Sequence, residues 1–192
     1  MKQIAEKIAR RMIDAGIIQK EKYLAYSYSI QMFLEKMTGM LIIMLLSVLL
    51  GRVVEVSIFF FFFANIRKYA GGFHCKTFLS CLILSVVSVL GLSCFVCPIL
   101  LRNNKWSVVC VALSLLVILV VGAVNHPNMD WNFEEYQRAK RMARIHIIFE
   151  TAVIMFCYIL GTKYLSYMSM GVVFSAITLL LARITRQEVE NT

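Results

Sequence analysis

The amino-acid sequence predicts an all-α membrane protein, a polytopic helical bundle of about six transmembrane helices (range four to six) preceded by an amphipathic helix. Composition is the first reason: 60% of the 192 residues are hydrophobic and 16% are charged, with a mean hydropathy of +0.75. A soluble domain cannot bury so much apolar surface. Long apolar stretches are the second reason. Soluble enzymes and nucleic-acid-binding domains are therefore excluded, and residues 1–192 are expected to form a single integral membrane domain.

The first segment has the pattern of an interfacial helix. Ile4, Ile8 and Met12 recur at helical spacing, while basic residues cover the other faces: Lys2, Lys7, Arg10 and Arg11. Gly16 is expected to end this helix. The alternative interpretation is an ordinary solvated helix that packs on the body of the protein.

Six apolar stretches follow, at about 37–51, 53–66, 78–101, 107–124, 145–161 and 164–182. A helix needs roughly 20 residues to cross the hydrocarbon core. The third and fourth stretches are long and free of charge. The first two are short unless the first begins near Ile30 and the second continues toward Tyr69. For this reason we predict between four and six spans.

The basic residues predict the orientation of these spans. With six spans and a cytoplasmic N-terminus, 16 of the 20 Lys and Arg residues lie on the cytoplasmic side. The other side holds Arg52, Arg102, Lys105 and Lys163. Both termini are therefore expected in the cytoplasm, with residues 67–76 at the inner membrane face and residues 125–144 in a cytoplasmic loop.

The cysteines and histidines predict neither a metal site nor a cofactor. Cys94 and Cys97 form a CxxC pair, but a second Cys pair or a nearby His is missing, and the sequence has no HExxH motif. Two other intramembrane protease classes are excluded as well, because Gly91–Cys94 lacks the final glycine of GxSG and no pair of membrane aspartates is present.

The densest group of polar residues is the segment from Arg67 to Thr77, with Cys81 just beyond it. Gly71 and Gly72 are expected to interrupt the helix, and Thr77 to cap the next one, which leaves Cys81 in its first turn. A thiolate is a nucleophile, and His74 is a possible base for it. On one unbroken helix these two residues are about 10.5 Å apart along the axis, so only the glycine break allows contact.

This segment resembles the signature of the accessory gene regulator B (AgrB) family, membrane cysteine endopeptidases that mature quorum-sensing peptides of Gram-positive bacteria. Five residues stand where that family has its arginine, two glycines, catalytic histidine and catalytic cysteine: Arg67, Gly71, Gly72, His74 and Cys81. Pro127 and Asn128, followed by the basic run Arg138 to Arg144, extend the resemblance. Cys75 beside His74 is a departure from the family pattern.

The resemblance implies that an AgrD-like precursor peptide loses its C-terminal tail through an acyl-thioester on Cys81, with His74 as the base. The precursor's own cysteine would then close a thiolactone. Substrate binding or oxyanion support would come from six residues: Arg67, Gly71, Gly72, Lys140, Arg141 and Arg144. The resemblance also implies a homodimer in the lipid of the bacterial cell membrane. The predicted topology places the active site at the cytoplasmic face, and the composition excludes a nucleic-acid partner.

Three interpretations remain open. Arg67 and Lys68 are also the residues that anchor a helix at the inner interface. The backbone amides that begin the Cys81 helix are an alternative source of oxyanion donors. The whole chain is alternatively a small multispan transporter or channel subunit, although Glu55 and Glu150 lie near predicted span boundaries and no inverted repeat is evident.

Overall fold

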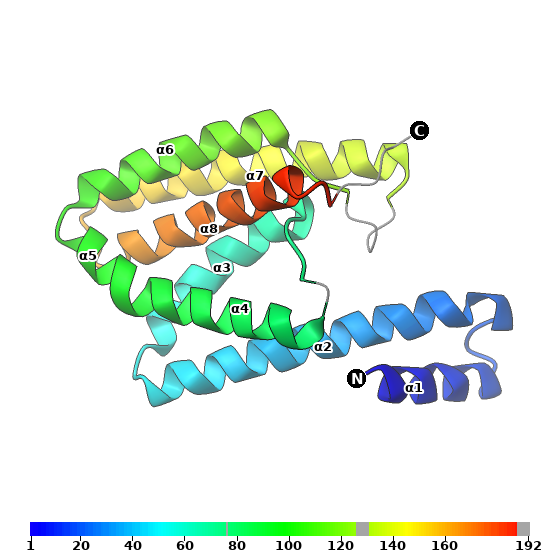
Figure 1. Ribbon diagram of the computed structural model, residues 1–192. Coiled ribbons are helices and arrows are strands. Elements are labelled where there is room, and N and C mark those ends of the chain that lie inside the picture. Colours follow the sequence, from blue (N-terminus) through cyan, green and yellow to red (C-terminus); the bar gives the residue numbers. More distant parts are fainter. Residues whose placement is uncertain (76, 126–130, 188–192) are drawn as a thin grey trace. The chain divides into compact units, whose positions relative to one another are not determined.

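The computed structural model describes residues 1–75, 77–125 and 131–187, and every regular element within these residues is a helix (Figure 1). In chain order the elements are α1 (Lys2–Asp14), the 3-10 helix η1 (Lys20–Lys22), α2 (Tyr23–Leu49), α3 (Val53–Ala70), α4 (Phe78–Gly91), the π-helix η2 (Leu92–Val96), α5 (Cys97–Leu101), α6 (Asn104–Val121), α7 (Phe133–Ile159) and α8 (Leu165–Ile184). The predicted all-α class is confirmed. The chain forms two compact units, Met1–Leu46 and Ser47–Thr192; the prediction of a single membrane domain stays a prediction.

The first unit contains α1, η1 and most of α2. Its small residues Ala5 and Ala9 are fully buried, while Ile4 and Ile8 keep exposed apolar side chains. Gly16, with a φ of 70°, follows α1, and its amide bonds to the carbonyl of Ile13 at 2.8 Å. The predicted end of the amphipathic helix is thus confirmed.

Among the described residues, five helices are long and apolar enough to cross a membrane: Lys20–Leu49, Phe78–Leu101, Asn104–Val121, Phe133–Ile159 and Leu165–Ile184. This number lies within the predicted range. The predicted span at 53–66 corresponds to α3, which has 18 residues but carries three charged ones, Glu55, Arg67 and Lys68. The first span begins well before residue 37, since α2 already starts at Tyr23.

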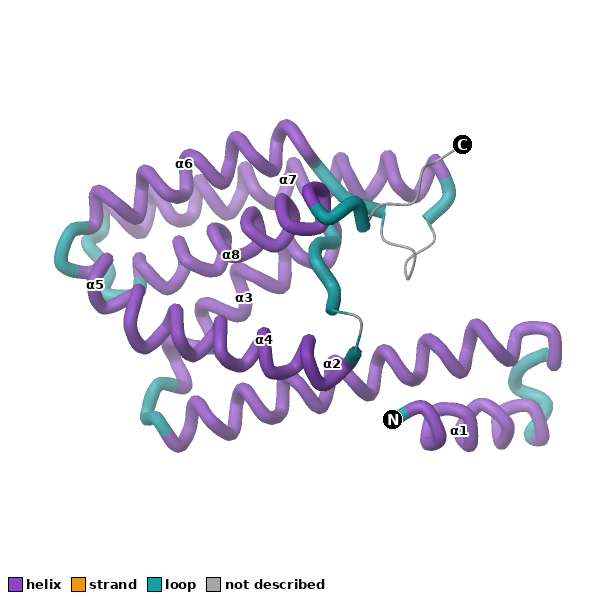
Figure 2. Tube along the Cα trace, in the orientation of Figure 1, coloured by secondary structure: helices purple, strands orange, loops and turns teal. Residues whose placement is uncertain are grey.

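The core of the second unit is built around α8. This helix packs most extensively against α3 and α6, and α7 contacts α3, α6 and α8 (Figure 2). Ile66, Ile118 and Leu179 are fully buried at these contacts. Large apolar residues on the outer faces, such as Val120 and Ile159, are more than 70% exposed. Such a surface is what a lipid environment covers.

Helices α3 and α8 approach each other closely at Gly171. A Cβ atom at this position would lie 2.5 Å from the carbonyl oxygen of Phe59. One turn further along α8, the hydroxyl of Ser175 donates to the carbonyl of Phe63 at 3.1 Å. The rings of Phe63 and Phe174 lie 5.1 Å apart. Small and hydroxyl-bearing residues therefore let the two backbones meet, as in other membrane helix pairs.

Residues 133–144 of the loop predicted for residues 125–144 are helical, and this part of the prediction is wrong. Helix α7 begins at Phe133, because Asn132 and Glu135 form a capping box in which each side chain bonds the other's backbone amide. Ala139 and Ala143 are buried beneath the basic residues. These positive charges therefore belong to a helix rather than to a loop, with Arg138 and Arg141 exposed and Lys140 and Arg144 half-buried.

The α3–α8 contact predicts how two glycine substitutions differ. Gly171→Ala places a methyl group against the backbone of α3, and overpacking of this kind costs roughly 1–3 kcal/mol. We expect a melting temperature several degrees lower for the detergent-solubilised protein. Gly91→Ala is the matched control, since no atom lies within 4 Å of its added Cβ. Equal melting temperatures for the two variants would contradict the close approach.

Candidate active site

The segment between α3 and α4 leaves the helix through two glycines. Gly71 has a φ of 70° and Gly72 a φ of 140°, conformations that residues with a side chain rarely adopt. A Cβ on Gly71 would lie 2.6 Å from the carbonyl oxygen of Val124, and a Cβ on Gly72 would overlap the guanidinium of Arg67. The predicted glycine break is confirmed, and both glycines make room for neighbouring groups.

Arg67, in the last turn of α3, holds this segment in place. Its Nη1 donates to the carbonyl of Gly71 at 2.9 Å, and its Nη2 donates to the carbonyl of Phe73 at 2.7 Å. The same Nη2 lies 3.3 Å from Nε2 of His74. A guanidinium only donates, so Nε2 takes part in this contact as an acceptor. Arg67 therefore orients both the backbone and the ring of the segment.

The end of α8 fixes the other side of the segment. The amide of His74 donates to Oε1 of Gln187 at 3.0 Å, and Nε2 of Gln187 donates back to the carbonyl of His74 at 2.9 Å. The amide of Phe73 donates to the carbonyl of Thr178 at 2.9 Å. The sequence did not predict a role for Gln187, because a lone glutamine after a helix gives no recognisable signal.

Cys81 lies in the first turn of α4, as predicted. Thr77 caps this helix: its hydroxyl accepts from the amide of Ser80 at 3.3 Å. The carbonyl of Thr77 accepts the amide of Cys81 at 3.1 Å. The positive end of the helix dipole therefore acts on the Cys81 sulfur.

Electrostatic and hydrogen-bond contacts connect these residues. The guanidinium of Arg67, which touches His74, also interacts electrostatically with Cys81. Cys75 and Cys81 are both free, half-buried thiols. Burial raises the pKa of the Cys75 thiol, so this thiol stays protonated at neutral pH. The arrangement thus brings a guanidinium into contact with an imidazole and within electrostatic range of the Cys81 sulfur.

The basic residues of α7 have different surroundings from one another. Nε of Arg144 donates to the carbonyl of Leu119 at 3.0 Å, near the end of α6. The aliphatic part of Lys140 covers Gly122, and its Nζ lies 5.9 Å from the ring centroid of Tyr136. Arg141 is exposed. Pro127 and Asn128 lie outside the described residues.

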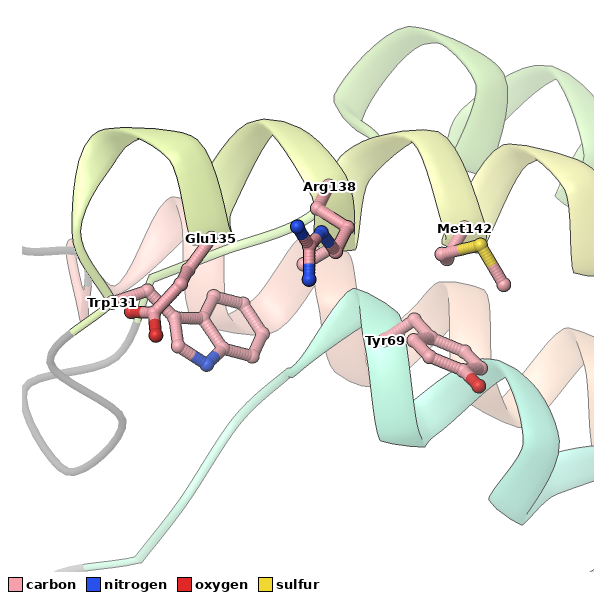
Figure 3. A pocket seen from close by; sticks show the side chains of 6 residues that line it. Tyr69, Trp131, Glu135, Arg138 and Met142 are labelled. Atoms are coloured by element: carbon pink, nitrogen blue, oxygen red, sulfur yellow. The ribbon is translucent and has the colours of Figure 1, made fainter.

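An open pocket of about 230 Å³ lies between the end of α3 and the start of α7. It is lined by Tyr69, Trp131, Glu135, Arg138, Ala139 and Met142. Figure 3 shows the side chains of Trp131 and Arg138 on the α7 side and that of Tyr69 on α3. The ring of His146 stacks on Tyr69 at 4.7 Å between centroids. An aromatic pocket with one guanidinium suits an apolar side chain that has a carboxylate nearby.

Comparison with known proteins identifies the family. The family model described as accessory gene regulator B matches residues 1–179, which is nearly the whole chain. Neither the curated proteins nor the solved structures gave a match. The chain therefore belongs to the accessory gene regulator B family, a peptide-processing family of the agr quorum-sensing system.

Proposed function

We propose that the chain is a membrane-embedded cysteine endopeptidase that removes the C-terminal tail from an AgrD-like precursor peptide. The observation that carries the proposal is the placement of Arg67: its Nη2 lies 3.3 Å from Nε2 of His74, and its charge acts on Cys81. A nucleophile, a base and a fixed cation at one site are the groups that acyl transfer needs.

In the proposed reaction the Cys81 thiolate attacks the carbonyl that joins the signal sequence to the tail. His74 takes the thiol proton and later gives it to the departing amine. A new C–S bond replaces the C–N bond, so the signal segment remains on the enzyme as an acyl-thioester. The precursor's own cysteine then attacks this thioester, which closes a thiolactone and frees Cys81.

The oxyanion that forms in this step needs hydrogen-bond donors. The amides of Ser80 and Cys81 are already bonded to Thr77. The first amides of a helix have no partner within the helix, so the amides of Phe78 and Leu79 are the donors that α4 offers. We therefore assign oxyanion binding to these two amides, with the Arg67 charge as support. Gly71 and Gly72 contribute indirectly by leaving room for Arg67.

The proposal includes six membrane crossings, with α3, which packs against α7 and α8, as the sixth. Its 18 residues extend about 27 Å, and its charged residues stand near its two ends. Both termini of this multi-pass protein then lie in the cytoplasm, and the segment with His74 opens at the cytoplasmic face of the cell membrane. A homodimer is part of the proposal on the strength of the family alone.

The pocket beside Tyr69 is proposed to bind the precursor. Its aromatic and methionine lining fits an apolar side chain, and Arg138 fits a carboxylate of an acidic tail. Glu135 weakens this attraction, although its carboxylate also accepts the Asn132 amide at 3.0 Å. Lys140, Arg141 and Arg144 are proposed to raise the local concentration of an acidic segment through their summed charge.

The catalytic assignment predicts the behaviour of two variants. Cys81→Ala is expected to abolish tail cleavage, and His74→Ala to reduce it by roughly 10²- to 10⁴-fold, the usual contribution of a general base. Both variants should insert into the membrane normally. Cys75→Ala is the control, and we expect it to retain measurable turnover.

The measurement is cleavage of the precursor in proteoliposomes, together with mass spectrometry of the protein after exposure to the precursor. A peptide adduct is expected on the tryptic fragment that contains Cys81. Normal processing by Cys81→Ala would refute the assignment. A transporter would give no adduct.

The space that Gly72 leaves for Arg67 predicts a second effect. Gly72→Ala displaces the guanidinium, so the rate of tail cleavage should fall at least about tenfold, one factor of ten for each 1.4 kcal/mol of lost positioning. Gly161→Ala also adds a side chain at positive φ, but nothing lies within 4 Å of its Cβ. This control separates backbone strain from displacement of Arg67. Equal rates for the two variants would rule out the role assigned to Gly72.

The pocket predicts a change in substrate affinity. Trp131→Leu removes one aromatic wall, and loss of an aromatic contact worth about 0.5–1.5 kcal/mol should raise KM roughly two- to twelvefold while kcat is retained. Phe133→Leu is the matched control, because Phe133 is exposed nearby and does not line the pocket. The experiment compares initial rates over a range of precursor concentrations. An unchanged KM for Trp131→Leu would exclude the pocket from precursor binding.

A further inference from the structure

The chain reverses direction at the end of α8, directly before Gln187. Among the described residues, Arg186 is the one residue other than glycine with a positive φ, at 54°. Its amide donates to the carbonyl of Arg183 at 3.2 Å. The amide of Gln187 donates to the carbonyl of Ala182 at 3.0 Å. These two bonds are the pair that defines a Schellman motif, with Arg186 in the left-handed position.

An arginine in the left-handed position indicates that contacts elsewhere hold this turn. Helices usually have glycine or asparagine there, because a longer side chain is crowded by its own backbone. The side chain of Arg186 is exposed, so its burial does not explain the conformation. Strained backbone persists where the surrounding structure fixes it. The contacts that can fix this turn are those of the next residue, Gln187.

The side chain of Gln187 bonds to both backbone groups of His74. Its Oε1 accepts the amide of His74 at 3.0 Å, and its Nε2 donates to the carbonyl of His74 at 2.9 Å. An uncharged carboxamide presents an acceptor and a donor side by side, which matches the amide and the carbonyl of one residue. Because both ends of the carboxamide are used, a rotation of the His74 backbone would break at least one of the two bonds.

His74 is therefore held at two separate points. Arg67, in α3, contacts the ring, since its Nη2 lies 3.3 Å from Nε2 of His74. Gln187, just beyond α8, holds the backbone that carries the ring. The two contacts limit different movements, rotation of the side chain and displacement of the backbone. Loss of the Gln187 bonds alone should thus allow the imidazole to occupy additional positions.

We propose that Gln187 is a positioning residue for His74, delivered to its place by the left-handed turn at Arg186. Its carboxamide keeps the backbone of the proposed base fixed, so that the imidazole retains one orientation. A proton-transfer group must lie within hydrogen-bond reach of its partner, and small displacements are costly. Gln187 lies beyond residues 1–179, the part of the chain that matches the family model. The effect on cleavage rests on the proposed function, whereas the effect on the His74 ring does not.

The first test is kinetic. Gln187→Met keeps the length of the side chain but removes both bonds, and we expect it to lower kcat for precursor cleavage roughly ten- to hundredfold. KM should change less than about twofold, because the lost interaction acts on the base and not on substrate binding. Thr185→Val is the matched control at the same helix end. The Thr185 hydroxyl is exposed and donates to the carbonyl of Leu181 within α8, so this variant should retain kcat.

The turn at Arg186 gives a second pair of variants, which lose the same charge. Arg186→Gly adopts a positive φ without strain, whereas the β-branched side chain of Arg186→Val disfavours it. We therefore expect a lower kcat for Arg186→Val than for Arg186→Gly, by about tenfold if the turn no longer delivers Gln187. This pair leaves the carboxamide itself in the chain, and it decides the question should Gln187→Met fail to fold.

A spectroscopic test observes the His74 ring without substrate. The full-length protein in nanodiscs is labelled with ring-¹³C histidine, and the His74 resonance is the one of three that His74→Ala removes. In Gln187→Met this resonance should shift or broaden, because the ring loses its fixed backbone. Thr185→Val should leave it unchanged. A role of Gln187 only in ending α8 would not move this resonance.

The outcomes separate this inference from the proposed function. An unchanged His74 resonance in Gln187→Met, or the same loss of kcat in Gln187→Met and Thr185→Val, would overturn the positioning role. Equal kcat and equal His74 resonances in the two Arg186 variants would overturn the role of the turn. A shifted resonance in Gln187→Met together with wild-type cleavage would leave the contact intact and instead overturn His74 as the base.

Discussion

The structure of the site depends on a positive charge whose hydrogen bonds go to neutral groups. Arg67 donates to the carbonyls of Gly71 and Phe73 and contacts the imidazole of His74. Carbonyl oxygens satisfy the donors of a guanidinium but do not cancel its charge, as a carboxylate would. The remaining charge is free to act on Cys81.

The same interaction explains the local sequence. Arg67 reaches the segment that follows its own helix only because that segment turns back at Gly71 and Gly72, and a side chain on Gly72 would occupy the position of the guanidinium. The segment in turn stays close to Arg67 because Thr178 and Gln187 bond its backbone from α8. Arg67 belongs to α3, whereas Thr178 and Gln187 lie in α8 and just beyond its end. Since α8 packs extensively against α3, the groups that hold the segment from both sides belong to one packed pair of helices.

Much of the site was predictable from residue preferences over a few neighbouring positions. The contacts that the sequence did not predict join residues far apart in the chain. The glycine break, the Thr77 cap and the place of Cys81 follow from residue preferences within a few positions. The helical start of α7 was missed because the capping box at Asn132 precedes a polar stretch, and polarity was interpreted as a loop. Gln187 lies 113 residues from His74, and only tertiary structure joins them.

The charge of Arg67 also acts on the base of the proposed reaction. When His74 takes the proton from Cys81, an imidazolium forms beside Nη2 of Arg67, and two like charges then lie in contact. The negative charge on the tetrahedral oxyanion offsets this repulsion only while the oxyanion exists. As the oxyanion collapses to the thioester, the repulsion returns and favours transfer of the proton to the departing amine. Arg67 would thus promote both the attack and the release of the tail, which is consistent with its position next to the imidazole.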